Sequence, residues 1–214
     1  KYSFNDLDFL KINLENNFKK DLLNLKLNFD YDKSLDINII NYKKSKNSIA
    51  NVSLDLEKSK KNIKINKLIF KENDNLISIK NLGLRGNKFL YLKSIKVETS
   101  NNNFFIRNDK KILIKGTNFD ATNLSKFLIN QSGENKLKDL NSQIEIDFLN
   151  IKVPMSEKLQ NFKLLGEIKS GQFIKISSKG DFGGNNCLDI SRKIDKNTNK
   201  KYLEIYSDLP RPLL

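Results

Sequence analysis

Histidine and tryptophan are absent from the sequence, and its 214 residues include one cysteine, one methionine and three prolines. Imidazole is the commonest general base in enzymes, and a single thiol can form neither an internal disulfide nor a thiolate metal site. The composition therefore disfavours catalysis. We predict a protein that is not an enzyme, with no catalytic residue, no metal site and no cofactor.

Long apolar runs are missing as well. The longest continuous one is Phe89–Leu92, whereas a helix that spans a membrane needs about 20 apolar residues. No signal peptide is visible, and the sequence begins with Lys1 instead of methionine. We expect the chain to be a segment of a longer protein, with a membrane anchor or export signal outside it.

Basic residues outnumber acidic ones by 39 to 25, which gives a net charge of +14 and suggests an anionic partner. Arginine, whose planar guanidinium suits bases and phosphates best, accounts for only Arg85, Arg107, Arg192 and Arg211. The remaining excess is lysine, spread along the chain with abundant asparagine and isoleucine. This distribution favours a solvated lysine surface over a nucleic-acid interface, and it is compatible with acidic lipid headgroups.

Alternation of apolar and polar residues is the dominant pattern. From Leu23 to Tyr31 every second residue is apolar, so a strand formed by this stretch has one apolar and one polar face. Such alternation is typical of antiparallel strands in a meander, because parallel strands buried on both faces are apolar throughout. The pattern recurs at 35–39, 52–56, 63–65, 76–79, 82–84, 90–92, 95–97, 104–106, 112–114, 144–148, 151–153, 162–164, 174–176, 188–190 and 203–205.

Polar clusters such as 43–47, 71–75 and 99–103 separate these stretches and predict hairpin turns. At about 117–138 the alternation stops, and apolar residues follow helical spacing behind Asp120, which suits a helix N-cap. Residues 3–18 fit neither period well, with a slight preference for a strand. We predict a mostly β protein, a long curled antiparallel sheet with one short helix near 121–130. No linker divides it, so residues 1–214 form a single continuous β segment.

Polar groups that could carry chemistry have a simpler structural interpretation. Glu145 with Asp147, and Asp55 with Glu57, share the polar face of a strand, where lysines balance them and no third group organises them. The glycines at 180–184 precede a strand-like run instead of a helix, so they predict a turn and not a phosphate loop.

The apolar stripes remain as the candidate functional feature. They either fill the core of an ordinary sandwich or barrel, or line a long open trough that receives an apolar ligand. Alternation alone does not separate the two possibilities, and on pattern alone the filled core is favoured.

The stretch from Ile63 to Asp120 carries a resemblance to a known family. It ends on Gly116, Phe119, Asp120 and Ala121, a Gly-x-x-Phe-Asp-Ala pattern ahead of the predicted helix. With the ending at 203–214, it resembles the AsmA-like superfamily of bacterial envelope proteins, of the TamB and YhdP type. In particular, it is similar to the C-terminal region of large alphaproteobacterial members, over about residues 60–214.

The resemblance implies a twisted sheet curled into a groove, tethered to the inner membrane of a Gram-negative bacterium and extending across the periplasm. Such grooves are proposed to carry phospholipids between the inner and outer membranes during outer membrane biogenesis. The bound partner is then the phospholipid acyl chain, and the resemblance does not identify the proteins that dock at either end. On this interpretation the alternating apolar residues contact lipid. Representative positions are Leu25, Leu27, Phe29, Ile37, Ile39, Leu54, Ile65, Val97, Ile146, Phe148, Ile176 and Ile205.

Two other functions stay open at this point. A filled β-sandwich would serve as an adhesion or scaffold module, and a basic β-domain would bind RNA or DNA. The six tyrosines are dispersed, which argues against a platform on which bases stack. We therefore expect a lipid conduit and no nucleic-acid partner.

Overall fold

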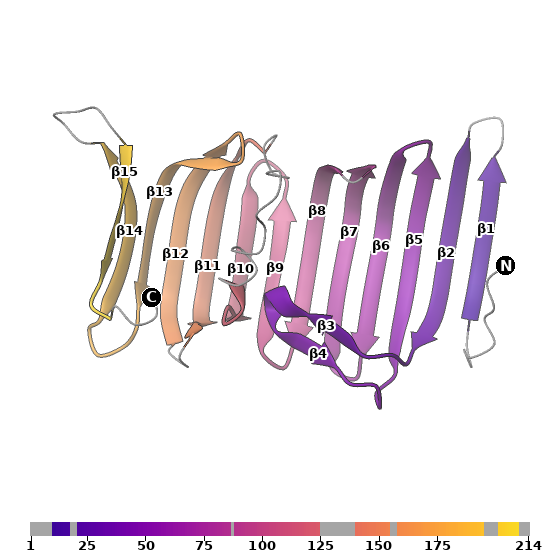
Figure 1. Cartoon of the computed structure of the whole chain (residues 1–214), viewed down its shortest axis with the longest axis horizontal. Helices are drawn as coiled ribbons and strands as arrows, with labels where there is room; N and C mark the ends of the chain where they lie inside the picture. The colour runs from indigo at the N-terminus through magenta and orange to yellow at the C-terminus, as the bar shows by residue number, and fades with distance from the viewer. Residues whose placement is uncertain are drawn as a thin grey trace. The chain divides into compact units, whose positions relative to one another are not determined.

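The computed structural model describes residues 10–17, 21–86, 88–124, 140–154, 158–194 and 201–209. Nearly all of this part of the chain is in strands, so the prediction of a mostly β protein is confirmed (Figure 1). Thirteen strands form one sheet in the order β1-β2-β5-β6-β7-β8-β9-β10-β11-β12-β13-β14-β15, and β3 pairs separately with β4. The large sheet is open and is not closed into a barrel.

The chain divides into two compact units. Unit 1 comprises residues 1–36 and 42–100, and unit 2 comprises residues 37–41 and 101–214. The sheet strands of unit 1 are β1 (Leu10–Asn17), β2 (Leu22–Tyr31), β5 (Ala50–Ser59), β6 (Asn62–Glu72), β7 (Asn75–Arg85) and β8 (Lys88–Thr99). Each pairs antiparallel with its neighbour.

Tight turns connect the strands of unit 1 where polar clusters predicted them. Between β6 and β7 the turn consists of Asn73 and Asp74, and the φ of Asn73 is 49°. Between β5 and β6 the turn contains Lys60, with a φ of 48°. Asparagine tolerates this left-handed conformation well, so the prediction of a hairpin at 71–75 is confirmed.

The alternation changes phase in the middle of β6 and β7. The apolar residues step by three instead of two from Ile65 to Leu68, and again from Ile79 to Leu82. Asn66 is the extra residue of a bulge against β5, where the register shifts between Asp55 and Leu56. Between β6 and β7 the register does not shift, and Asn66 and Asn81 are both left out of the pairing. Apolar side chains therefore stay on the same face along both strands. Gly83 also lies at a register shift, in the pairing of β7 with β8.

The stretch predicted as one strand at 35–39 forms a strand and a turn. β3 (Leu35–Ile37) is followed by a 3-10 turn, Asn38–Ile40, and β4 (Tyr42–Lys44) returns beside β3. Asn41 at the end of the turn has a φ of 48°. At the N-terminal side, β1 confirms the preference for a strand over a helix.

Unit 2 contains seven strands of the sheet. They are β9 (Asn102–Asn108), β10 (Ile112–Asp120), β11 (Ser142–Lys152), β12 (Lys158–Lys169), β13 (Gln172–Asp181), β14 (Cys187–Ile194) and β15 (Lys201–Ser207). The sheet is mixed: one pair departs from the predicted antiparallel arrangement, because β10 and β11 pair in parallel. Both strands present apolar residues at alternate positions, and alternation does not report strand direction.

The predicted helix at 121–130 falls mostly outside the described residues. Within them, Ala121 to Asn123 form a turn and Leu124 is helical. Asp120 accepts a hydrogen bond from the backbone N–H of Thr122 at 3.1 Å, and the Leu124 N–H donates to the Ala121 carbonyl at 3.0 Å. Asp120 therefore makes the side-chain contact expected of a capping residue.

Candidate functional site

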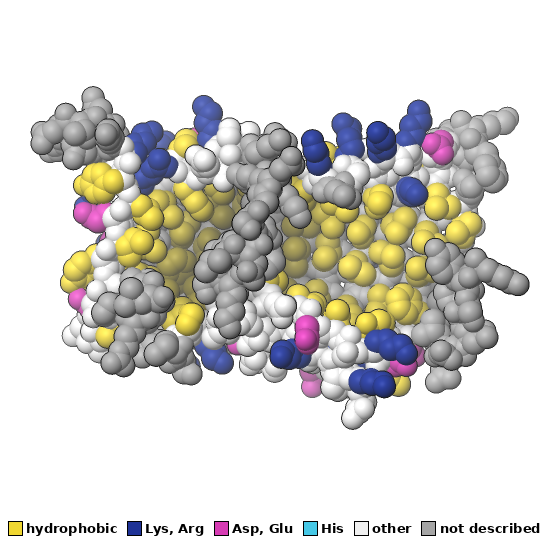
Figure 2. Space-filling model, viewed as in Figure 1, with side chains coloured by type: hydrophobic (Ala, Val, Ile, Leu, Met, Phe, Trp, Pro, Cys, Tyr) yellow, Lys and Arg dark blue, Asp and Glu magenta, His cyan; other side chains and the backbone are white. Residues whose placement is uncertain are grey.

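One face of the unit 1 sheet is apolar from strand to strand (Figure 2). Leu54 on β5 lies opposite Leu27 on β2 and Leu68 on β6, and Ile79 on β7 continues the row. Paired residues in a sheet point to the same side, so these side chains form one surface. We call it the unit 1 apolar face. Its members on β2 and β5–β8 are Leu23, Leu25, Leu27, Phe29, Val52, Leu54, Leu56, Ile63, Ile65, Leu68, Phe70, Ile77, Ile79, Leu82, Leu84, Leu92, Ile95 and Val97.

Most of the unit 1 apolar face is only half-buried. Every member of the face other than Phe70 and Val97 keeps part of its surface exposed, and Figure 2 shows apolar side chains at the molecular surface there. The described part of the chain therefore leaves the middle of this face open. Phe70 and Val97 are buried members, and Ala50 in the row beyond Val52 is fully buried.

A polar cluster closes this buried end of the unit 1 apolar face. Glu72, at the end of β6, accepts hydrogen bonds from the hydroxyls of Tyr42 and Ser48. The Tyr42 ring packs edge-on against Phe70, with ring centroids 6.0 Å apart. Burial, and then the hydrogen bond and charge of Glu72, raise the pKa of Tyr42 far above its ordinary value. Tyr42 is therefore a permanent hydrogen-bond donor.

Lys44 belongs to the same cluster, although its side chain is only 2% exposed. Its Nζ donates hydrogen bonds to the carbonyls of Lys33 at 2.9 Å, Ser45 at 3.0 Å and Ser48 at 2.5 Å. It also lies 5.5 Å from the centroid of the Tyr31 ring. A buried ammonium is costly unless its donors are satisfied, and three carbonyls satisfy this one. We call Tyr42, Lys44, Ser48 and Glu72 the polar plug.

Unit 2 also has an apolar face, and much of it is packed. Ile144, Leu164 and Ile168 form a buried cluster. Half-buried apolar residues from neighbouring strands pack against this cluster, namely Ile112, Ile114, Leu140, Ile146, Phe162 and Ile176. Further along the strands, Ile151, Leu159 and Leu188 are buried as well.

Three phenylalanine rings pack against one another in unit 2. Phe119 stacks on Phe148 with centroids 5.5 Å apart, and Phe104 meets both rings edge-on at 5.5 and 5.8 Å. Gly116 lies directly opposite Phe104 and Phe148 in the sheet. A Cβ on Gly116 would lie 2.4 Å from the Phe104 Cβ, so glycine provides the room in which the rings meet.

Asp120 is the centre of a buried polar network in unit 2, with a 1% exposed side chain. It accepts hydrogen bonds from the amide of Asn41 at 3.1 Å and the hydroxyl of Thr122 at 2.5 Å, and Lys152 Nζ lies 3.7 Å away. The Asn102 side chain accepts from the Asp120 N–H at 2.9 Å. Burial acts to raise the pKa of Asp120, but the hydrogen bonds and Lys152 together hold it below its ordinary value.

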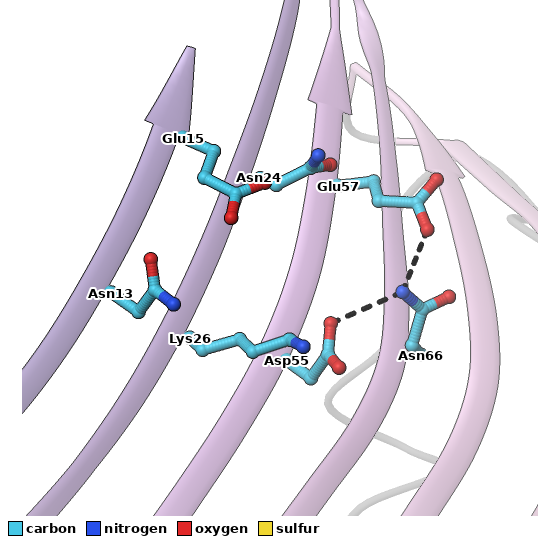
Figure 3. A pocket seen from close by; sticks show the side chains of 7 residues that line it. All are labelled: Asn13, Glu15, Asn24, Lys26, Asp55, Glu57 and Asn66. Atoms are coloured by element: carbon cyan, nitrogen blue, oxygen red, sulfur yellow. Dashed lines mark hydrogen bonds between the residues drawn. The ribbon is translucent and has the colours of Figure 1, made fainter.

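The opposite face of unit 1 is polar and carries a pocket of about 200 Å³ (Figure 3). The Asn66 amide donates to Asp55 at 3.1 Å and to Glu57 at 2.8 Å, and Lys64 Nζ lies 3.6 Å from Glu57. The bulge at Asn66 therefore bridges the two carboxylates, as Figure 3 shows. Glu57 is therefore paired with a lysine, Asp55 is held by a neutral amide, and no nucleophile or imidazole is among the residues that line this pocket.

The second carboxylate pair lies on the polar face of unit 2. Glu145 is 2.5 Å from Lys111 Nζ and 2.8 Å from Lys115 Nζ, and Asp147 is 3.8 Å from Lys115. Hydrogen bonds from Lys111 and Lys115 lower the pKa of Glu145 from 4.5 to about 2. This surface is a row of exposed ion pairs.

The glycines at 180–184 form a turn between β13 and β14. Gly183 and Gly184 have φ values of 87° and 62°. The Gly183 N–H donates to Asp181 at 2.6 Å, and the Asn186 N–H donates to the Gly183 carbonyl at 3.1 Å. Since turn N–H groups are used internally, the geometry is that of a turn and not that of a phosphate cradle.

The structure places ten of the twelve predicted lipid-contacting residues on strands of the large sheet. On unit 1, Leu25, Leu27, Phe29, Leu54, Ile65 and Val97 share the apolar face. On unit 2, Ile146, Phe148, Ile176 and Ile205 lie on β11, β13 and β15. Ile37 and Ile39 lie instead at the end of β3 and in the 3-10 turn.

Exposure differs widely within this set. Val97 and Phe148 are each 3% exposed, so little of either side chain is available to a ligand. Ile205 and Ile39 are exposed, and the remaining members are half-buried. The polar plug could not be predicted from the sequence, because nothing in the local pattern distinguishes the buried Lys44 from the exposed Lys43.

Neither a transmembrane helix nor a metal site is found in the described parts of the chain. No helix there is long and apolar enough to cross a membrane. No cluster of three or more cysteine, aspartate or glutamate side chains there has the geometry to hold a metal ion.

Comparison with known proteins identified no relative: no family model, no curated protein and no solved structure matches the chain.

Proposed function

We propose that the chain is a non-enzymatic lipid carrier that binds phospholipid acyl chains against the apolar faces of its sheet. In this proposal it is a segment of a longer AsmA-like protein of a Gram-negative bacterium. That protein is tethered to the inner membrane, and its groove conducts phospholipids across the periplasm toward the outer membrane. The AsmA-like assignment and the location follow from the sequence resemblance alone.

The observation that carries the proposal is the half-buried unit 1 apolar face. Its apolar side chains recur in register over five neighbouring strands, yet no described layer covers them. Exposed apolar surfaces of this extent are uncommon on soluble proteins and mark sites of interaction. On each strand the apolar side chains also follow one another along the strand direction, which suits a ligand that is itself long, narrow and apolar.

The energetics of acyl-chain binding suit such a surface. Each CH₂ group that leaves water contributes about 0.8 kcal/mol, so six buried methylenes contribute about 5 kcal/mol. The half-buried leucines and isoleucines would gain further burial from the same contact. Neither term requires a specific pocket, so a chain can shift from one position to the next without chemistry.

Native mass spectrometry of the purified chain, with extraction and identification of bound lipid, tests the proposal. We expect co-purifying phospholipid, and a several-fold lower lipid count for the Leu54→Asn, Leu56→Asn variant. The matched control is Ser53→Asn, Asp55→Asn, which introduces the same side chains on the same strand but on the polar face. It should retain its lipid.

Absence of lipid from the wild-type chain, under conditions that preserve a known lipid carrier, would contradict the proposal. The same result combined with cooperative unfolding would favour the second candidate, an adhesion or scaffold module. In such a module a further protein layer would cover the unit 1 apolar face. A basic nucleic-acid-binding domain would instead show affinity for RNA or DNA that falls steeply with salt.

A further inference from the structure

The two ends of the unit 1 apolar face differ in charge. At one end lie the β5–β6 and β7–β8 turns, which are adjacent because Asn62 pairs with Arg85. The exposed residues of this end include five cations, Lys58, Lys60, Lys61, Arg85 and Lys88. Among the described residues of the same turns, and of the neighbouring chain before β2, Asp21 is the single acid. We call this end the basic margin.

The cations of the basic margin are not neutralised by described neighbours. None of the five forms an ion pair within the described part of the chain, and Arg85 Nε donates to the neutral Asn62 side chain at 3.0 Å. Lys58 lies between Leu23 and Ile63 in the last row of the unit 1 apolar face. Its side chain therefore leaves the strand on the apolar face, at the row where the apolar residues end.

The opposite end carries both signs of charge and is closed. The polar plug occupies it, and Figure 2 shows blue and magenta side chains together there, whereas blue dominates at the basic margin over β5–β8. The acids of the closed end are Asp32, Asp36, Glu72, Asp74 and Glu98, and its lysines are Lys33, Lys43, Lys44, Lys46 and Lys71. An anionic group gains less at this end than at the basic margin.

The distance between the two ends suits one acyl chain. From Lys58 to Val52 along β5 there are six residue steps, which at the rise of a strand span about 20 Å. The hydrocarbon of one membrane leaflet is about 15 Å thick, half of a bilayer core. A phospholipid with its phosphate at Lys58 can therefore place its acyl chains along the strands and end before the polar plug.

We infer that unit 1 binds anionic phospholipids in one orientation, with the headgroup at the basic margin and the acyl chains pointing toward the polar plug. This inference rests on the proposed lipid-carrying function and adds to it a headgroup charge and a direction. Arg85 and the four lysines attract the negative headgroup, while the plug supplies a polar wall that an acyl chain does not pass.

Orientation is measured with single tryptophan reporters, which are possible because the chain has no tryptophan of its own. Ile63→Trp reports on the basic margin, and Phe29→Trp reports near the plug. Each variant is loaded with phospholipid that carries a nitroxide either beside the headgroup or at the end of the acyl chain. We expect the headgroup nitroxide to quench the Ile63→Trp reporter at least twofold more than the Phe29→Trp reporter, and the terminal nitroxide to show the reverse.

Headgroup preference is measured by presenting phosphatidylglycerol and phosphatidylcholine in the same neutral detergent micelle and counting bound lipid by native mass spectrometry. We expect at least a fivefold preference for phosphatidylglycerol. Substitution of Lys58, Lys60, Lys61 and Lys88 by glutamine should abolish it. The matched control replaces four exposed lysines of the closed end, Lys33, Lys43, Lys46 and Lys71, by glutamine and should keep it.

Equal binding of the two lipids, or equal quenching of the two reporters, would overturn the inference. If lipid is still counted on the protein in that case, the proposed function stands. Failure to bind either lipid would overturn both. Inorganic phosphate is the soluble probe. The inference fails if phosphate binds the lipid-free chain, if the glutamine variant abolishes this binding, and if bound lipid shows no orientation. In that case the lysines bind free anions and not lipid headgroups.

Discussion

The two units build apolar faces from the same alternation and pack them to different degrees. In unit 1 the buried members lie at the end closed by the polar plug, and the middle rows around Leu54 stay half-exposed. In unit 2 Phe148, in the middle of β11, is buried, and Ile144, Leu164 and Ile168 form a buried cluster toward one end of β11 and β12. Alternation therefore determines which side of a strand is apolar, but it does not determine whether that side is covered.

The difference implies a division of roles. Side chains that are already buried contribute to the free energy of unfolding, because removing them leaves a cavity. Half-exposed side chains contribute less to stability and retain surface that a ligand can cover. We expect substitutions in unit 2 to affect folding first, and substitutions in the middle of the unit 1 apolar face to affect binding first.

The largest expected effect compares Phe148→Ala with Leu54→Ala. Phe148 packs against Phe104 and Phe119, so its loss should lower the free energy of unfolding by about 3–5 kcal/mol. Leu54 is half-exposed, and its loss should cost about 1–2 kcal/mol. Urea unfolding followed by circular dichroism measures both. Equal losses would mean that the two faces are equally covered and would remove the comparison.

Next in size is the effect of removing the buried carboxylate of unit 2. Asp120→Ala leaves the donors of Asn41 and Thr122 without their acceptor, which should cost about 2–3 kcal/mol. As a control, Asp147→Ala removes a carboxylate that is partly exposed and 3.8 Å from Lys115, and should change stability by about 0.5 kcal/mol or less. If Asp120→Ala leaves the free energy of unfolding unchanged, the hydrogen-bond network around Asp120 does not stabilise unit 2.

Gly116→Ala should cost about 1–3 kcal/mol, because the new methyl group would collide with the Phe104 Cβ and with the Asn103 carbonyl oxygen 2.3 Å away. Gly166→Ala is the matched control on the same face. Its methyl would meet the side chains of Phe173 at 2.8 Å and Ile144 at 3.0 Å, which can move more easily than backbone. Thermal unfolding should therefore rank Gly116→Ala below Gly166→Ala, and the opposite ranking would contradict the close packing assigned to Gly116.

The smallest effect is a pH dependence that belongs to unit 2. The folded pKa of Glu145 lies at about 2, below its ordinary 4.5, so its ion pairs stabilise the folded state above pH 4.5. This contribution is lost as the pH falls from 4.5 through about 2. The unfolding midpoint of Glu145→Gln should lie slightly below that of the wild type at neutral pH and match it below pH 2. A difference that persists below pH 2 would assign the effect to something other than ionisation.

Much of the fold could be predicted from the sequence, and the failures have physical causes. The strands, their apolar sides and the turn at 71–75 follow from local periodicity and turn chemistry. The bulge at Asn66 and the unpaired position at Asn81 are not predicted from the sequence, although the steps from Ile65 to Leu68 and from Ile79 to Leu82 are a readable signal. Two apolar residues three positions apart would point to opposite faces of a regular strand. A bulge at one of the residues between them returns both side chains to the same face.

The candidate site was predictable only as a list of apolar positions. Which of them are covered depends on contacts between segments far apart in sequence. The residues adjacent in sequence to Phe148 and to Lys44 do not indicate that these side chains are buried. The Gly116, Phe119 and Asp120 pattern was noticed, but its contacts with Phe148 and Asn41 were not foreseeable. The charge difference between the ends of unit 1 could have been noticed, because its lysines cluster in two turns.

The parallel pair of β10 and β11 has a consequence for how the chain finds its alignment. In a hairpin the turn itself fixes which residues face each other, but no tight turn connects a parallel pair. A shift of the β11 register by two residues would keep every side chain on the same face of the sheet, so the alternation of apolar and polar residues does not exclude such a shift. The space beside Gly116 admits the Phe148 ring, and a slip would bring Ile146 or Asn150 opposite that glycine instead. Gly116, which has no side chain, thus selects the register in which β11 pairs with β10.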